Sequence, residues 1–364
     1  MAQSGGKISF LQLAMLLLLV NGLMNHVILN PIVLDASGRD AWLVPIFSAL
    51  FLVPWCLLLV YFMKKSGQQK LQPWLAQRTH PAVSWILIVP LYIQIYLIGT
   101  TTLLQTSIWT VTNYLPATPR FALSLTLIAV CAYCAISGLR TIAISAGVLL
   151  PFVVVLGYFV MIANMPNKEY DRLFPMLEFG MKPVMDGMLY AGSGFMEFVL
   201  ILALQQHLKT RIKSWQILIL ALLFIHIMLG PIVGAITEFG PEEAAKQTES
   251  PYEQWRLVKV GDSIEHVDFF SVFQWLAGTM VRISLSLFLL GDMLSFSLAK
   301  YRNRFIVCMA LSYLFVTLLP ITQQSLYEFM HRYYFHLSLI VILGSTLIWT
   351  LISVTTKTGK EGTS

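Results

Sequence analysis

Charged residues are scarce in this chain, because only 12% of its 364 residues are Asp, Glu, Lys or Arg while 57% are hydrophobic. The mean hydropathy of +0.72 is far above what the surface of a water-soluble domain of this length tolerates. The composition therefore excludes a soluble globular protein and predicts an all-α polytopic membrane protein.

Cysteines and recognisable catalytic sequences are also few. All four cysteines lie in apolar stretches, and the pair Cys131 and Cys134 lacks the second pair or nearby histidine that a metal or redox motif needs. The chain contains no H-E-x-x-H, no nucleophile elbow and no phosphate-binding glycine loop. We therefore expect no enzyme and no bound metal or cofactor. Because the basic residues lie in short loops between apolar runs, the formal net charge of +6 does not indicate nucleic-acid binding.

Long apolar runs are plentiful, and each run of about 18 or more residues predicts a helix that spans the membrane. Ten such runs lie at about 11–34, 41–63, 82–113, 121–139, 142–163, 184–206, 215–237, 270–298, 304–322 and 336–356. We interpret residues 1–364 as a single membrane domain, because the largest gap, 238–269, is too short for a soluble domain. Residues 241–254 in this gap predict a short surface helix that is either a solvated cap or a lid or docking surface.

The basic residues of the loops set the expected orientation. One side of the membrane would carry fourteen Lys and Arg residues and a single acid, Glu361, whereas the other would carry nine basic residues and fifteen acids. Loops enriched in Lys and Arg remain in the cytoplasm. We therefore expect both termini to be cytoplasmic and the 238–269 loop to be extracytoplasmic.

The run at 184–206 has an unusually polar centre, which contains Gly192, Ser193, Gly194 and Glu197. Unpaired backbone groups and charges are costly at bilayer depth, and they persist where they face protein or a water-filled cavity. This pattern predicts a broken helix that forms half of a small-solute site. Glycines also serve simply to let helices pack closely, so that interpretation stays open.

The first run contains a matching interruption at Asn21, Gly22, Asn25 and His26, which ends at Pro31. Runs 1 and 6 each head a set of five and cross the membrane in opposite directions. We therefore predict two inverted repeats, 11–163 and 184–356, with helices 1 and 6 broken around a central site. The ends of broken helices offer unpaired N–H groups to a carboxylate and unpaired C=O groups to an ammonium, as a zwitterionic amino acid requires.

The remaining charges within runs are Arg282 and Asp292. Arg282 and Glu197 lie near the middle of their helices, so Glu197 either contacts a ligand, cation or proton or only pairs with Arg282. Asp292 is expected near the cytoplasmic end, with the basic residues of 300–304. The candidate substrate-binding residues are Asn21, Gly22, Asn25, His26, Tyr96, Thr100, Gly192, Ser193, Gly194, Glu197 and Arg282.

Several short motifs, in their order along the chain, carry a resemblance to a known family. They are Lys7-Ile-Ser-Phe-Leu-Gln12, the break that ends at Pro31, Arg39-Asp40-Ala41-Trp42-Leu43, Leu173-Phe-Pro-Met-Leu-Glu-Phe-Gly-Met-Lys-Pro183 and Phe195-Met-Glu197. With them the chain resembles the endospore germination permease family, the B subunit of spore germinant receptors. That family lies within the amino acid–polyamine–organocation superfamily of two inverted five-helix repeats.

The resemblance implies a germinant sensor in the spore inner membrane that binds L-alanine or another amino acid. It also implies two partners, a membrane-spanning A subunit and a lipoprotein C subunit. Asn25 and His26 stand where superfamily amino-acid permeases usually have small residues, so a sugar or a differently shaped amino acid also fits. The alternative function is an autonomous amino-acid permease coupled to protons or sodium, with Glu197 as the coupling carboxylate.

Overall fold

The computed structural model describes residues 6–259 and 267–355, and this part of the chain is helical, with one isolated parallel β-bridge between Ile8 and Leu208. Nine helices in these ranges are long and apolar enough to cross a membrane: Phe10–Ile28, Asn30–Lys65, Pro81–Asn113, Arg120–Ser137, Leu139–Ala163, Lys182–His207, Ser214–Phe239, Phe269–Met293 and Gln323–Thr355. The all-α polytopic prediction is confirmed. The predicted span 304–322 corresponds to a 19-residue helix, Ala299–Thr317, that begins with three cations and lies outside this set of nine.

Several spans are divided into shorter elements. The first half contains α1 (Phe10–Gly22), η1 (Leu23–Ile28), α2 (Asn30–Ser37), η2 (Gly38–Trp42), α3 (Leu43–Lys65), α4 (Leu71–Ala76), α5 (Pro81–Asn113), α6 (Arg120–Ser137), α7 (Leu139–Ala163), η3 (Met165–Asn167) and η4 (Tyr170–Leu173). The second half contains α8 (Lys182–Met196), η5 (Glu197–Val199), α9 (Leu200–Leu204), η6 (Gln205–His207), α10 (Ser214–Phe239), α11 (Pro241–Ala244), α12 (Ser250–Arg256), α13 (Phe269–Met293), α14 (Ala299–Thr317), α15 (Gln323–Phe329), η7 (Met330–Tyr334) and α16 (Phe335–Thr355).

The two spans that carry Glu197 and Arg282 are the most buried of the nine, and α7 is the least buried. In the most apolar 18-residue stretch of Lys182–His207, 83% of the residues are buried, and the value for Phe269–Met293 is 72%. In Leu139–Ala163, by contrast, only 11% are buried. Because a charge in hydrocarbon is costly, the spans that carry Glu197 and Arg282 occupy the interior, and α7 presents its side chains to lipid.

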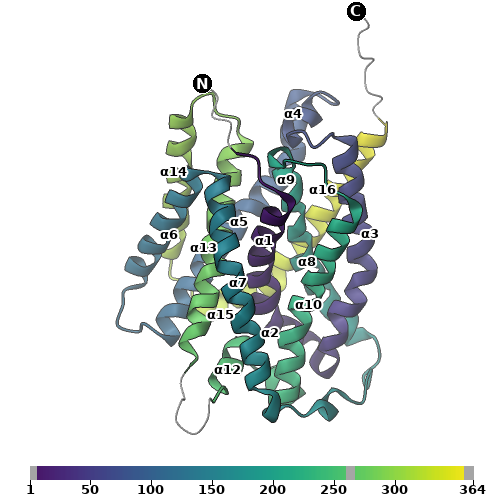
Figure 1. Ribbon diagram of the computed structural model, residues 1–364, viewed down its shortest axis with the longest axis vertical. Helices are drawn as coiled ribbons and strands as arrows, with labels where there is room; N and C mark the ends of the chain where they lie inside the picture. Colours follow the sequence, from purple (N-terminus) through teal and green to yellow (C-terminus); the bar gives the residue numbers. More distant parts are fainter. Residues whose placement is uncertain (1–5, 260–266, 356–364) are drawn as a thin grey trace, which may run out of the picture.

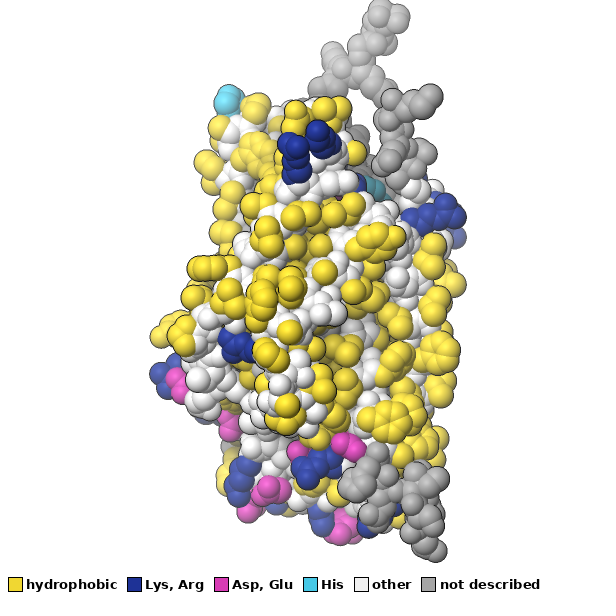
Figure 2. Space-filling view, turned by 90° about the vertical axis from the view of Figure 1, so that its left-hand side faces the viewer, with side chains coloured by type: hydrophobic (Ala, Val, Ile, Leu, Met, Phe, Trp, Pro, Cys, Tyr) yellow, Lys and Arg dark blue, Asp and Glu magenta, His cyan; other side chains and the backbone are white. Residues whose placement is uncertain are grey.

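The two ends of the bundle differ in charge. The first described helix, α1, begins and the last, α16, ends at the same end of the bundle, and α12 lies at the opposite end (Figure 1). On the face seen in Figure 2, acidic side chains appear only at the end where α12 lies, while Lys and Arg appear at both ends. This arrangement fits the predicted orientation, in which the acidic loops face outward.

The expected breaks in spans 1 and 6 are changes of helix type. In span 1, α1 passes into the π-helical segment η1, where Leu29 N donates to Met24 O at 2.8 Å. In span 6, α8 passes into the 3₁₀ segment η5 at Glu197. π-Helical and 3₁₀ segments inside long helices often mark functional sites, because they redirect backbone groups.

Part of the loop that includes residues 241–254 is buried. Ser250 Oγ donates to Asn30 Oδ1 at 2.9 Å, directly after η1, and Gln254 Nε2 donates to Pro231 O at 2.9 Å. Burial raises the pKa of the Glu249 carboxyl. Hydrogen bonds from Thr248 and Gln323 partly offset this rise, and the nearby carboxylate of Glu253 adds to it. This loop is therefore packed against the first span, although its residues 260–266 lie outside the described ranges.

Candidate functional site

The interruptions of spans 1 and 6 meet at Gly194. A Cβ atom added to Gly194 would overlap Asn25 Oδ1 and Leu29 Cδ1, so only a glycine lets α8 approach η1 this closely. Asn25 and Ser193 are also buried, with 0% and 1% of their surface exposed. The two halves that were predicted to share one site are therefore in direct contact.

A buried ion pair lies directly beside this contact. Arg282 on α13 donates to both carboxylate oxygens of Glu197, from Nη1 to Oε2 and from Nη2 to Oε1, each at 2.5 Å. Both side chains are 1% exposed. Bidentate pairing is the strongest geometry available to a guanidinium and a carboxylate, and it compensates for the loss of water around both groups.

Two further acceptors complete the surroundings of Arg282. Its Nε donates to Thr102 Oγ1 at 2.8 Å, and its Nη1 donates to the backbone carbonyl of Val20 at 2.9 Å. Arg282 thereby joins α1, α5 and η5 to α13. The ion pair holds together the four elements that surround the contact between the interruptions.

Tyr334 and Gln94 are additional members of this cluster. Gln94 Nε2 donates to Tyr334 Oη at 3.1 Å, and Tyr334 lies close enough to Glu197 and Arg282 to interact with both electrostatically. Tyr334 belongs to η7, a second π-helical segment. The sequence of span 10 contains no glycine or proline at this point, so its composition gave no signal of the π segment.

Several buried polar atoms of the two interrupted spans have no hydrogen-bond partner within the described chain. They are both side-chain amide atoms of Asn21, both of Asn25 and the hydroxyl of Ser193. Buried polar groups are nearly always hydrogen-bonded, and leaving one unpaired costs about 1–3 kcal/mol. Amides supply both a donor and an acceptor, so this set can bind a small polar molecule.

The other predicted binding residues point elsewhere. His26 Nδ1 is 3.1 Å from the Ile227 carbonyl of α10, and Tyr96 Oη donates to Ser312 Oγ on α14 at 3.2 Å. Thr100 Oγ1 donates to the carbonyl of Tyr96 in its own helix. A Cβ on Gly192 would lie 3.3 Å from Leu339 Cδ1 of α16, and one on Gly22 would meet no atom within 4 Å. The structure therefore brings Asn25 to Gly194 and pairs Glu197 with Arg282, and it buries Asn21 and Ser193 in the same two spans. His26, Tyr96, Thr100 and Gly192 meet other groups.

Asp292 takes part in a second polar cluster, at the end of the bundle where α1 begins. Its Oδ2 accepts hydrogen bonds from Gln206 Nε2 and His207 Nε2, each at 3.0 Å, and its backbone carbonyl accepts from Lys70 Nζ. The expected pairing of Asp292 with residues 300–304 is therefore wrong. These basic side chains begin α14, whereas η6 is the segment that reaches the end of α13.

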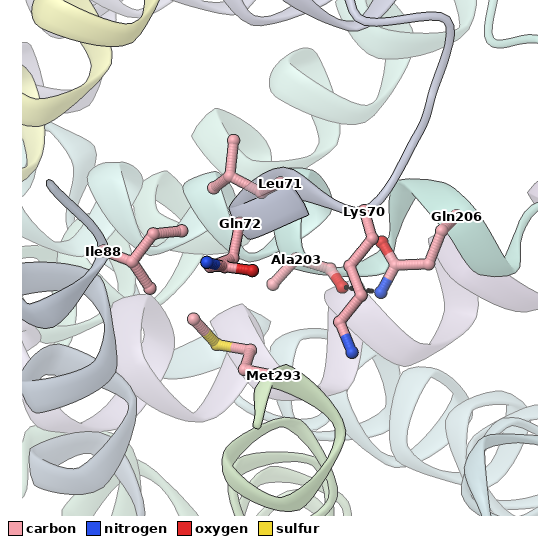
Figure 3. Close-up of a pocket in the computed structure, with 7 residues that line it drawn as sticks. All are labelled: Lys70, Leu71, Gln72, Ile88, Ala203, Gln206 and Met293. Carbon is pink, nitrogen blue, oxygen red and sulfur yellow. Dashed lines mark hydrogen bonds between the residues drawn. The ribbon is translucent and has the colours of Figure 1, made fainter. Parts of the chain in front are cut away.

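A hollow of about 10 Å³ lies beside this second cluster and is lined by Lys70, Leu71, Gln72, Ile88, Ala203, Gln206 and Met293 (Figure 3). That volume suits a single water molecule. Burial lowers the pKa of Lys70, and Asp292 partly opposes this effect. We therefore assign the polar cluster a structural role and place the candidate ligand site at Gly194.

The motifs behind the family resemblance contact one another in pairs. Leu177 N donates to Asp40 Oδ1 at 2.9 Å, and Arg39 forms an ion pair with Glu178. Ile8 N donates to the carbonyl of His207 at 2.8 Å, which ties the N-terminal motif to the end of span 6. Both pairs connect the first half of the chain to its second half.

Comparison with known proteins agrees with this pattern. The family profile described as spore germination protein matches residues 7–326. Spore germination protein XB of Bacillus anthracis is 39% identical over 350 residues, which cover 95% of this chain and 98% of that protein. A match over nearly the whole of both chains, with the same motifs in contact, shows that this multi-pass membrane protein belongs to the spore germination protein family.

Proposed function

We propose that this chain is the nutrient-sensing subunit of a spore germinant receptor. In this proposal, a small nutrient such as L-alanine or another amino acid binds where η1 meets α8. The observation that carries it is the set of unpartnered atoms of Asn21, Asn25 and Ser193 at the contact between two interrupted helices. The role is one of binding and not of catalysis.

The chemistry of the site suits a zwitterion. The amide nitrogens of Asn21 and Asn25 can donate to a carboxylate, and their oxygens can accept from an ammonium group. Sugar hydroxyls satisfy the same amides, so a sugar stays within the ligand class. Because Arg282 occupies both oxygens of Glu197, the ion pair supports the site and the neutral groups make the contacts with the ligand.

The alternative of an autonomous permease requires Glu197 to take up a coupling proton or sodium ion. Its bidentate pairing with Arg282 disfavours that role, because both carboxylate oxygens already accept a hydrogen bond from the guanidinium. We therefore favour a sensor that changes conformation when the nutrient binds and that transmits the change to partner subunits. Such transmission requires the nutrient to bind one conformation more tightly than the other.

Assembly and location belong to the same proposal. The chain would work with the membrane-spanning A subunit and the lipoprotein C subunit in the spore inner membrane, with both termini in the cytoplasm. The shared position of the first and last described helices at the basic end of the bundle supports this orientation. Purification of the chain from spore membranes should recover both partners together with it.

Asn25→Leu tests the binding site, since leucine has the same branched skeleton of side-chain heavy atoms but no hydrogen-bonding atoms. We expect the affinity of the purified full-length chain for its nutrient to fall about tenfold or more, as the loss of one or two hydrogen bonds predicts. Calorimetry with a panel of L-alanine, other amino acids and sugars measures this affinity. The matched control is Asn113→Leu at the outer end of α5, where the amide bonds only to Trp109 O.

Two results would count against the proposal. If no member of the panel binds the wild-type chain, or if Asn25→Leu binds as tightly as Asn113→Leu, the contact at Gly194 is not the nutrient site. Uptake of labelled amino acid by the chain alone in liposomes, driven by a proton or sodium gradient, would instead support the permease.

A further inference from the structure

A second group of titratable side chains lies on the outer half of α8, away from the ion pair. Tyr190 Oη and His331 Nε2 are 2.9 Å apart, and their rings stack with centroids at 5.0 Å. Tyr327 also stacks with His331, with centroids at 5.9 Å and an angle of 16° between the ring planes. The imidazole of His331 is therefore in contact with two tyrosine rings.

A carboxylate completes this group. Tyr327 Oη lies 3.4 Å from Asp35 Oδ2 on α2, and Asp35 also interacts electrostatically with Tyr190. Asp35 is exposed and His331 is half-buried, so protons reach the group from solvent. We call Asp35, Tyr190, Tyr327 and His331 the outer cluster.

The outer cluster is connected to the ion pair through η7. This π segment contains both His331, which contacts Tyr190, and Tyr334, which contacts Gln94 beside Glu197 and Arg282. Phe335 N donates to Met330 O across the segment, as the wider π-helical turn requires. A change at His331 therefore acts on the same short segment that positions Tyr334.

We propose that the outer cluster is a proton-binding site that regulates the nutrient site, an inference that rests on the proposed function. Protonation of His331 places a cation against two tyrosine rings, and the Asp35 carboxylate lies 3.4 Å from the hydroxyl of one of them. The cation is attracted to the rings and to the carboxylate. The bound proton thus stabilises the packing of α2, α8 and α15 against one another. In this packing the side chains of Asn21, Asn25 and Ser193 are buried.

The direction of the effect follows from the groups that face His331. The charged and titratable groups that accompany Tyr190, Tyr327 and His331 are Asp35 on α2 and Asp186 on α8, which both act on Tyr190, and His336 on α16, whose ring meets that of Tyr190. Glu328 and Arg332 lie within three residues of His331 and are exposed, where solvent screens them. A proton on His331 adds a cation–π attraction to the tyrosine rings that it contacts. Low pH should therefore strengthen the packing of α2, α8 and α15.

Thermal unfolding of the purified full-length chain in detergent tests the proton site without any nutrient. We expect the difference in Tm between the wild type and His331→Gln to be about 2–4 °C larger at pH 5.5 than at pH 8, in favour of the wild type. Glutamine keeps a hydrogen bond to Tyr190 but cannot take up a proton. If the difference between the two proteins is the same at both pH values, the outer cluster binds no proton and the proposal fails.

Two other variants guard against misfolding and general effects. Asp35→Asn changes an exposed side chain and should reduce the pH-dependent shift without unfolding the protein. His80→Asn replaces an exposed histidine that caps α5, and asparagine preserves the cap. His80→Asn should show the pH dependence of the wild type, and the loss of the dependence in this variant as well would overturn the assignment to His331.

Nutrient binding by the same proteins separates this inference from the proposed function. We expect the apparent affinity of the wild type to weaken about three- to tenfold between pH 8 and pH 5.5, and that of His331→Gln to stay constant. An equal pH dependence in both proteins would refute the regulatory role. Absence of binding at every pH, with the pH-dependent Tm intact, would refute the proposed nutrient site and leave the proton site standing.

Discussion

Replacing Glu197 with Leu should lower the free energy of unfolding by about 3–5 kcal/mol, the largest loss that we expect from a single change outside the backbone. The guanidinium of Arg282 is 1% exposed and would lose both acceptors that it shares with Glu197. The contacts with Thr102 and Val20 are too weak to compensate for a buried unpaired charge. The level of the protein in membranes and its Tm in detergent measure the effect.

Removing both charges at once distinguishes a structural pair from a group that must be charged to function. The double variant Glu197→Leu with Arg282→Met should recover most of the stability, because a hydrophobic pair of similar volume avoids the cost of burying two ions. Asp186→Asn is the matched control. Its partner Lys182 is exposed, so this change should cost less than about 1 kcal/mol. Equal stability of Glu197→Leu and Asp186→Asn would contradict the burial of the pair.

Pairing with Arg282 was one of the two roles that the sequence left open for Glu197, and it has a simple physical reason. Two opposite charges in the middle of apolar spans have no water to solvate them, so each must find the other. Most of the spans were equally predictable from long apolar runs, as was the approach of the interruptions in spans 1 and 6. Glycines and asparagines in a span are unfavourable unless they face protein.

The remaining contacts of the candidate site and of the second polar cluster depend on packing that no residue pattern shows. Tyr334 reaches the ion pair from a π segment that no glycine or proline marks in the sequence, and His207 reaches Asp292 because η6 ends beside α13. Tyr96 and Thr100 were predicted to line the cavity from their polarity. Thr100 instead satisfies its own helix backbone, and Tyr96 satisfies Ser312. Polarity predicted that these side chains need partners but not which partners they find.

Replacing Gly194 with Ala should abolish the response to nutrient while the protein still accumulates. The new methyl group would overlap Asn25 Oδ1 and Leu29 Cδ1, so η1 and α8 must separate or Asn25 must turn away. Overpacking of this kind costs about 1–3 kcal/mol, less than the loss of the buried ion pair. We expect the nutrient concentration needed for half-maximal germination of spores to rise more than tenfold, with the abundance of all receptor subunits measured beside it.

The matched control for this substitution is Gly230→Ala on α10, where an added Cβ meets no atom within 4 Å. Both changes add one methyl group to a helical glycine in a spanning segment, and both gain the same helix propensity. They differ only in what the methyl group contacts. If the two variants respond to nutrient alike, the close approach of α8 to η1 is not needed for sensing, and the shared site at Gly194 must be abandoned. If only Gly194→Ala loses its response, with normal protein levels, Gly194 is needed because it lets the interrupted helices meet around the ligand.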